Sequence, residues 1–207
     1  MSETLDLYSF YDGDRSAKVR WTAAELGIDV EEHRIKGGDH LKPPYTDMNP
    51  LGQIPSVRFH DEMFVESTAI CRSLVDAISE PRLEVDRGEE GRKTFHYWMG
   101  VFCENFEGRL VDAALAKLKI VGPEYFDLHQ DVLRRKLAVV AKELPREGYL
   151  CGERFTLADI CAGYSLLLAV QTKLVPIDDV NPYLGRLRER PGAIQARVFT
   201  GLDKSGR

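Results

Sequence analysis

Hydrophobic and polar positions in the first 80 residues form short segments that follow two different periods. Residues 5–9 are mostly apolar and precede a polar turn, a pattern typical of a buried strand. Apolar positions then recur at helical spacing and predict a helix over residues 15–26, which Gly27 would end. Residues 28–35 form a second strand-like segment, and the glycine and proline pairs that follow indicate a loop.

Two further strands are predicted over residues 55–59 and 63–65, joined by a polar turn, and helical spacing returns over residues 66–78. A helix between the first two strands favours a parallel pair with a right-handed crossover. With the final hairpin, the pattern predicts a four-stranded mixed sheet with helices packed against it.

Beyond residue 80 the pattern changes to long helical periodicities. Helices are predicted over residues 89–118, 123–144, 157–172, 181–189 and 191–199. Thr156 and Asp159 have the spacing of a capping box, in which each side chain binds the backbone amide of the other residue. The predicted fold class is α+β, with a sheet-containing domain at residues 1–80, a linker at 81–88 and an all-helical domain at 89–207.

The chain has 207 residues, and 28 Lys and Arg against 33 Asp and Glu give a formal net charge of −5. A net acidic surface repels phosphate backbones, so no nucleic-acid partner is expected. The longest apolar run, residues 162–170, is too short to span a bilayer, so no membrane partner is expected. Because the first residues lack a signal-peptide pattern and the four cysteines lack disulfide or metal spacing, we expect a cytoplasmic protein with reduced thiols.

The most informative segment reads MNPLGQIPS from Met48 to Ser56, and ESTAI begins at Glu66. Read separately, these residues also fit an ordinary turn and an ordinary strand start. A proline that opens a strand can follow a cis peptide bond, which would leave the main chain of Ile54 facing outward to pair with a peptide-like ligand. Glu66 and Ser67 open a helix whose unpaired amides favour an anion, so this end can hold both charges of an α-amino acid.

The order of these elements and motifs resembles that of the glutathione transferases over nearly the whole chain. The resemblance implies a thioredoxin-like domain followed by an all-helical bundle, glutathione as co-substrate, and a homodimer. It also implies that Ile54 binds the cysteinyl backbone of glutathione through its main chain, with Pro55 as a cis-proline. Glu66 and Ser67 would hold the γ-glutamyl end.

The string IKGGDHL, from Ile35 to Leu41, is most similar to the theta class, with bacterial relatives close behind. The resemblance implies that His40 in this string, together with Gln53, reaches the glycyl end of glutathione. From its residue type alone, a loop histidine such as His40 is more often a solvated surface residue, and its place in the theta-like string is what favours the glycyl end.

A member of this family must stabilise the thiolate of bound glutathione, and the side chains that usually do so are missing here. Alignment places Gly13 where some classes carry serine or cysteine, and Ser9 where others carry tyrosine. The remaining donors are Tyr11, Arg15 and Ser16. A cation at Arg15 stabilises a thiolate directly, whereas Ser16 also fits a helix N-cap and Tyr11 also fits the mouth of the pocket.

Aromatic side chains concentrate in the first long helix of the second half, at Phe95, Tyr97, Trp98, Phe102 and Phe106. They are expected to fill the core or a subunit interface, with some lining the site of a small hydrophobic electrophile.

No histidine pair has metal-ligand spacing, so no metal site is expected. The predicted function is conjugation of the glutathione thiolate to such electrophiles. The alternatives are a non-catalytic binding protein of the same fold, or a glutathione-dependent isomerase, dehalogenase or peroxidase.

Overall fold

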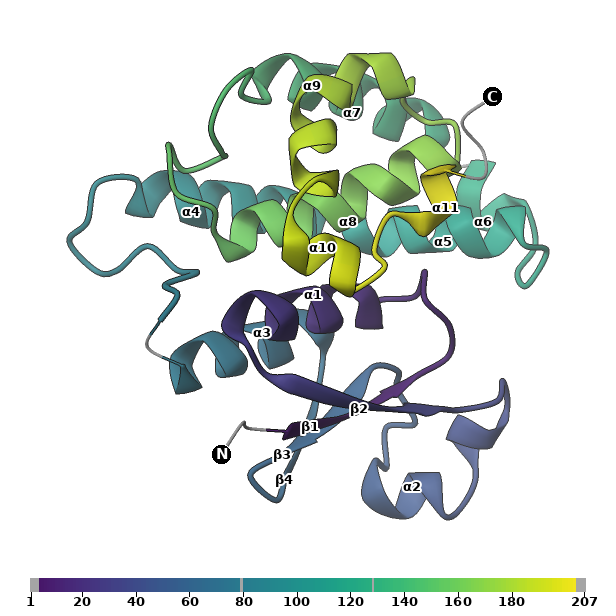
Figure 1. Cartoon of the computed structure of the whole chain (residues 1–207). Helices are drawn as coiled ribbons and strands as arrows, with labels where there is room; N and C mark the ends of the chain where they lie inside the picture. The colour runs from purple at the N-terminus through teal and green to yellow at the C-terminus, as the bar shows by residue number, and fades with distance from the viewer. Residues whose placement is uncertain (1–3, 79, 128, 204–207) are drawn as a thin grey trace. The chain divides into compact units, whose positions relative to one another are not determined.

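The computed structural model describes residues 4–78, 80–127 and 129–203 (Figure 1). The chain divides into two compact units, the first formed by residues 1–83 and 191–198 and the second by residues 84–190 and 199–207. The segment 191–198, which the helical pattern placed in the second domain, therefore packs within the first unit. The domain limits themselves stay a prediction.

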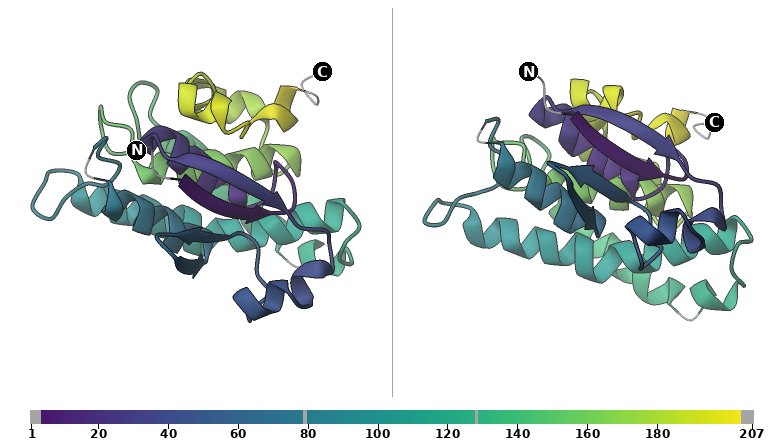
Figure 2. Two further views of the ribbon diagram at one scale, coloured as in Figure 1. Left: turned by 60° about the horizontal axis from the view of Figure 1, so that its bottom comes forward. Right: turned by 90° about the horizontal axis from the view of Figure 1, so that it is seen from below.

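The first unit contains a four-stranded sheet in the order β2-β1-β3-β4 (Figure 2). Its strands are β1 (Thr4–Ser9), β2 (Asp29–Arg34), β3 (Ser56–Phe59) and β4 (Glu62–Val65). β1 is parallel to β2 and antiparallel to β3, which confirms the predicted mixed sheet. Leu5 and Leu7 are completely buried on one face of β1, and the alternation of a strand places Asp6 and Tyr8 on the other face.

Helices α1 (Ser16–Leu26) and α3 (Ser67–Ala77) lie together on the face of Leu5 and Leu7, as predicted (Figure 1). α1 ends at Gly27, whose φ of 71° is a left-handed conformation that glycine adopts readily. The expected loop after β2 contains two short helices that the sequence did not predict. The 3₁₀-helix η1 (Asp39–Leu41) and α2 (Tyr45–Met48) are too short to show a helical period.

The first unit is completed by α10 (Pro191–Gln195), which packs against α1. The two helices approach closely, since a Cβ atom at Gly192 would lie 2.7 Å from the Glu25 side chain. Ala193, Ala196 and Val198 are buried. The predicted helix over residues 191–199 is wrong beyond Gln195, because Arg197 adopts a left-handed φ of 54° that ends helical geometry.

The second unit is helical. It contains α4 (Arg92–Met99), the π-helix η2 (Gly100–Phe106), α5 (Glu107–Lys117), α6 (Glu124–Asp127), α7 (Gln130–Glu143), α8 (Leu157–Gln171), α9 (Ile177–Arg188) and α11 (Thr200–Asp203). The helical segment is continuous from α4 through η2 to α5, which confirms the helix predicted over residues 89–118 apart from its ends. The single helix predicted over 123–144 divides into α6 and α7. α9 begins before the predicted residue 181 and contains Pro182 in its interior.

The predicted capping box at the start of α8 is confirmed. Asp159 accepts hydrogen bonds from the amide of Thr156 at 2.9 Å, the amide of Leu150 at 2.9 Å and the hydroxyl of Tyr183 at 2.7 Å. Burial raises the pKa of Asp159, although these hydrogen bonds oppose the shift. The box therefore joins the preceding loop and α9 to the most buried helix of this unit.

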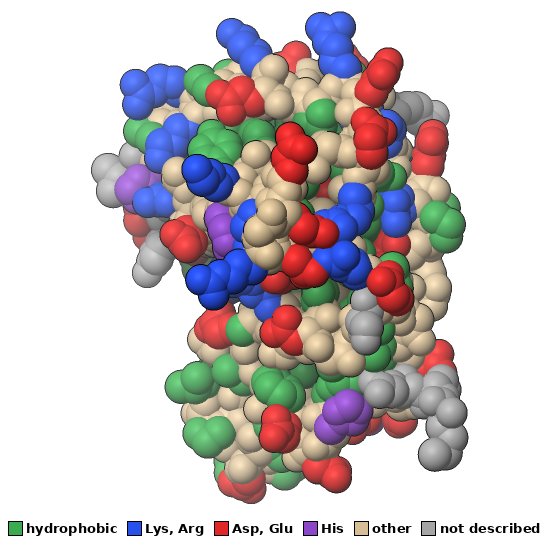
Figure 3. Space-filling view, turned by 90° about the vertical axis from the view of Figure 1, so that its left-hand side faces the viewer, with side chains coloured by type: hydrophobic (Ala, Val, Ile, Leu, Met, Phe, Trp, Pro, Cys, Tyr) green, Lys and Arg blue, Asp and Glu red, His purple; other side chains and the backbone are tan. Residues whose placement is uncertain are grey.

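On the surface shown in Figure 3, Lys and Arg side chains gather in the upper part, interspersed with Asp and Glu side chains, whereas the lower part carries Asp and Glu side chains among hydrophobic ones. Among the helices that the structure describes, none combines the length and the hydropathy needed to cross a membrane.

Candidate functional site

Six residues from three segments of the first unit surround one small pocket. They are Arg15 before α1, then Gln53, Ile54 and Pro55 before β3, and Glu66 and Ser67 at the start of α3. The volume of this pocket is about 70 Å³, well below the roughly 300 Å³ of a small complete ligand site. It therefore suits a head group, and the remainder of a longer ligand would lie on the open surface beside it.

The start of α3 gives this pocket groups of both polarities. Ser67 is the first helical residue and is 5% exposed, so its hydroxyl lies beside the unpaired amides of the first helical turn. Glu66 is exposed and has φ 69° and ψ 102°, a strained conformation of the kind that concentrates at ligand sites. Glu66 can bind an ammonium group, while Ser67, the helix amides and Arg15 can bind a carboxylate.

A buried hydrogen-bond network holds the turn before β3 in place. The Tyr45 hydroxyl donates to the carbonyl of Gln53 at 2.7 Å, and the side-chain amide of Asn49 donates to the same carbonyl at 2.9 Å. The peptide bond between Ile54 and Pro55 is cis, as predicted. Pairing of β3 with its neighbours begins at the following residue, so the main chain of Ile54 stands outside the ladder, where a strand-like ligand contact needs it.

Among the described residues, Arg15 is the one candidate for thiolate stabilisation that lines this pocket. Ser16 is completely buried away from it. The Ser16 hydroxyl donates to the carboxylate of Asp14 and accepts a hydrogen bond from Nη1 of Arg20 at 2.7 Å. Because both of these bonds engage the hydroxyl, Ser16 has a structural role in the loop.

The ring of Tyr11 lies over Gly13, where a Cβ atom would be 3.1 Å from it. Burial, followed by the negative charge of Asp14, raises the pKa of the Tyr11 hydroxyl, which makes it a poorer proton donor. Ser9 is completely buried, and its hydroxyl donates to Glu32 at 2.8 Å. The two positions that usually carry the activating group thus hold a glycine and a hydroxyl engaged elsewhere.

His40 lies outside the residues that line the pocket. Its Nδ1 atom accepts a hydrogen bond from the amide of Gly38 at 3.2 Å, and its ring contacts Phe10 edge-on with centroids 4.8 Å apart. The structure therefore brings five of the six predicted glutathione-binding residues together, and the role of His40 stays a prediction.

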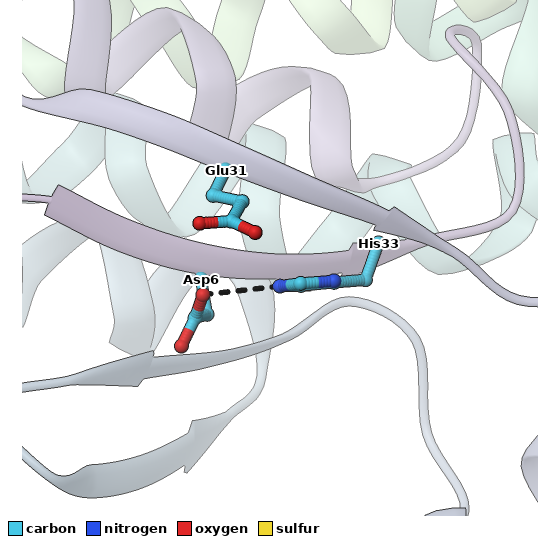
Figure 4. Close-up of side chains that lie close together, drawn as sticks. All are labelled: Asp6, Glu31 and His33. Atoms are coloured by element: carbon cyan, nitrogen blue, oxygen red, sulfur yellow. Dashed lines mark hydrogen bonds and ion pairs between the residues drawn. The ribbon is translucent and has the colours of Figure 1, made fainter.

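A separate polar cluster lies on the sheet face that carries Tyr8 (Figure 4). Potential ligand atoms of Asp6, Glu31 and His33 lie within 4.8 Å of one another, so the cluster has the residue types of a metal site. His33 Nε2 lies within hydrogen-bond distance of Asp6 Oδ1, at 3.0 Å, and the His33 ring stacks on Tyr8. The sequence did not reveal this cluster, because the β1–β2 register creates it.

Sequence reasoning missed Asp14, which organises the loop beside the pocket. Its carboxylate accepts hydrogen bonds from the amides of Phe10 at 2.6 Å, Tyr11 at 3.2 Å and Ser16 at 2.7 Å. An aspartate just before a helix is a common capping residue, and this was the signal available. Tyr45 and Asn49 were also missed, since their partner Gln53 is reached only through the fold of the turn.

Comparison with known proteins identifies the same family in both halves of the chain. The glutathione S-transferase N-terminal domain matches residues 7–82, and the glutathione S-transferase C-terminal domain matches residues 110–190. The two matches together include most of the chain.

Individual relatives agree with these matches. Glutathione S-transferase 3 of Zea mays is 28% identical over 201 residues, which cover 93% of this chain and 84% of the relative. Glutathione S-transferase GstA of Escherichia coli O157:H7 is 25% identical over 181 residues, covering 86% of each. The crystal structure of glutathione transferase URE2P6 from Phanerochaete chrysosporium, in complex with oxidized glutathione, has a TM-score of 0.80 at 24% identity and covers 98% of this chain and 97% of that chain. This likeness confirms the predicted fold class, and the theta-like class stays a prediction.

Proposed function

Because the chain belongs to the glutathione S-transferase family, and is a transferase whose co-substrate is glutathione, we propose that it conjugates the glutathione thiolate to small hydrophobic electrophiles. The observation that carries this proposal is the pocket that brings Ile54 together with Glu66, Ser67 and Arg15. A homodimer and a cytoplasmic location, both expected from the family, belong to the same proposal.

The pocket matches the zwitterionic γ-glutamyl end of glutathione. We assign the ammonium group to Glu66, and the carboxylate to Ser67 and the amides at the start of α3. The cysteinyl backbone then pairs with the main chain of Ile54, and the glycyl end extends toward Gln53 and His40. In this placement only the γ-glutamyl head group enters the pocket, which is consistent with its volume of about 70 Å³.

Arg15 is the group that we assign to the thiolate. A thiol has a pKa of about 8.5, and lowering it by two takes roughly 2.7 kcal/mol of preferential thiolate stabilisation. A guanidinium keeps its charge throughout the working pH range, so it can supply part of this energy without exchanging a proton. Arg15 is suited to this task because it lines the pocket together with Ile54, the proposed partner of the cysteine.

Calorimetry with reduced glutathione tests the binding site. Ser67→Ala and Glu66→Ala should each weaken binding about tenfold, the effect of losing one charge-assisted hydrogen bond. Ser73→Ala is the matched control, since Ser73 belongs to the same helix but not to the pocket lining. No binding by the native protein, or equal affinities for Ser67→Ala and Ser73→Ala, would contradict the proposed site.

Ultraviolet titration of the bound thiol tests Arg15. Arg15→Ala should raise the pKa of this thiol, while Arg15→Lys should retain much of the native value because it keeps the charge. A variant with an unchanged thiol pKa but a higher KM would instead assign Arg15 to the glutathione carboxylate.

A non-catalytic glutathione-binding protein is the second candidate. It is favoured by Gly13 and by the engagement of Ser9 with Glu32, which leave the two usual activating positions without a donor. A turnover screen with aryl halides, epoxides, hydroperoxides and cis-enones separates the candidates. Glutathione binding with neither turnover nor a lowered thiol pKa would favour the non-catalytic binding protein. Turnover of hydroperoxides or cis-enones, rather than aryl halides or epoxides, would point to a different glutathione-dependent reaction.

A further inference from the structure

The loop before α1 is held from behind by Arg20, which is 6% exposed. Nη1 of Arg20 donates to the hydroxyl of Ser16 and to Oε1 of Glu32, both at 2.7 Å. Nη2 donates to the carbonyl of Asp12 at 2.5 Å, and Nε donates to the carbonyl of Ala196 at 3.3 Å. One guanidinium therefore joins the loop, the start of α1, β2 and the segment 191–198.

Arg20 holds the loop at two points. It holds the middle directly through the Asp12 carbonyl, and it holds the end through the Ser16 hydroxyl, which donates in turn to the Asp14 carboxylate. Arg15 lies between Asp14 and Ser16 in the chain, so its backbone is fixed on both sides. The Arg20 side chain itself does not line the pocket.

A second layer of charges surrounds this arrangement. Nη2 of Arg197 lies 3.3 Å from Oδ1 of Asp12 and 3.4 Å from Oε2 of Glu32. Nη2 of Arg34 pairs with both of the same acids. Burial would raise the pKa of Asp12, but the hydrogen bond from Arg34 and the charges of Arg197, Arg34 and Arg20 outweigh it and lower that pKa. Asp12 therefore stays ionised near neutral pH, where it pairs with Arg34 and Arg197.

We propose that Arg20 is a positioning residue for thiolate stabilisation: together with the segment 191–198, it holds the loop so that Arg15 faces the pocket. This inference rests on the proposed role of Arg15. The bond from Arg20 to Ala196 spans 176 positions of sequence, so a late segment of the chain would help to set the geometry of a site formed by its first 70 residues.

Arg20→Lys tests the proposal, because lysine keeps the charge but loses the fork that binds several acceptors at once. The pKa of the bound thiol should rise, and kcat/KM at neutral pH should fall about tenfold, since misplacing a reacting group is costly. The dissociation constant of glutathione should change less than about threefold, because the groups assigned to its γ-glutamyl end are untouched. Ser16→Ala, a smaller change to the same relay, should shift both quantities in the same direction.

Arg186→Lys is the matched control in the second unit. Nε of Arg186 donates to the carbonyl of Gly148 at 3.3 Å and its Nη2 atom donates to that of Pro145 at 2.6 Å, so the variant loses a similar fork. It should lower stability without changing the thiol pKa. A native thiol pKa in both Arg20→Lys and Ser16→Ala, or equal effects of Arg20→Lys and Arg186→Lys, would overturn the inference. If the native protein does not bind glutathione, the result contradicts the proposed function rather than the positioning role of Arg20. If Arg20→Lys does not fold, the thiol pKa of Ser16→Ala tests the positioning role.

Discussion

Asp14 in the first unit and Asp159 in the second are both buried aspartates that collect hydrogen bonds at the start of a helix. Asp14 accepts from three backbone amides and from the Ser16 hydroxyl. Asp159 accepts from two backbone amides and from the hydroxyls of Thr156 and Tyr183. The chemistry is nearly the same, but the surroundings are not.

The difference lies in what each aspartate holds in place. The partners of Asp159 are a loop, a helix start and a buried tyrosine, which together form part of a packed core. The partners of Asp14 belong to the loop next to Arg15, which lines the pocket. Loss of Asp159 should therefore affect stability alone, whereas loss of Asp14 should affect both stability and thiolate stabilisation.

Asp159→Ala should have the largest effect on stability. The substitution leaves four buried donors without their acceptor, and we expect the free energy of unfolding to fall by about 4 kcal/mol. Urea unfolding followed by circular dichroism measures the change. Asp131→Ala is the control, since Asp131 is exposed in the first turn of α7. A loss below about 1 kcal/mol for Asp159→Ala would contradict this role.

Asp14→Ala should cost less stability, about 2 kcal/mol, because Asp14 lies nearer the surface and water can reach some of its donors. Its kcat/KM should nevertheless fall about tenfold or more at neutral pH, since the loop that carries Arg15 loses its acceptor. Unfolding and steady-state kinetics on the same preparation separate the two effects. If Asp14→Ala lowered stability but kept the native kcat/KM, Asp14 would have a purely structural role like that of Asp159, which would contradict the proposed difference between them.

Thr156→Ala should cost about 1 kcal/mol, the usual value of an N-cap residue. Asp159 keeps its other donors in this variant, so the loss is smaller than that from Asp159→Ala. The dissociation constant of glutathione, measured by calorimetry, should stay at its native value. A weakened affinity would show that the capping box acts on the binding site as well as on the core.

The smallest effect concerns pH, because Asp12 and Asp159 have pKa values shifted in opposite directions. The lowered pKa of Asp12 gives stability that is present above about pH 3.9 and is lost as pH falls through the folded-state value. The raised pKa of Asp159 gives a contribution that is present below about pH 3.9 and is lost as pH rises through its folded-state value. Asp12→Asn should therefore flatten the acid side of the stability curve, as measured by urea unfolding over a pH series, while Asp131→Asn should leave it unchanged. An acid side as steep in Asp12→Asn as in the native protein would exclude this role of Asp12.

Features with a strong local signal could be predicted from the sequence. The apolar segment that forms β1, the capping box of α8 and the cis-proline before β3 each depend on residues close in the chain, and all three are present in the structure. The same holds for five of the six glutathione-binding candidates, which lie in two short motifs that flank the β3–β4 hairpin.

Features that depend on distant contacts could not be predicted. The partners of Arg20 include Glu32 and Ala196, and no local pattern indicates that these residues meet. The left-handed turn at Arg197 interrupts a segment with good helical spacing, because packing on α1 overrides the local preference. The role of His40, which a motif indicates, stays a prediction, because His40 does not line the pocket and its ring contacts Phe10.

The return of residues 191–198 to the first unit has a consequence for protein synthesis. The N-terminus of a nascent chain emerges from the ribosome first, and domains generally fold from the N-terminus onward during synthesis. Here α1 lacks α10 until residues 191–195 have been translated, so the first unit is completed only after residues 84–190 of the second unit have been made. Premature termination anywhere before residue 191 would leave this unit without its closing helix, and a nascent chain would expose the uncovered side of α1 to chaperones and proteases.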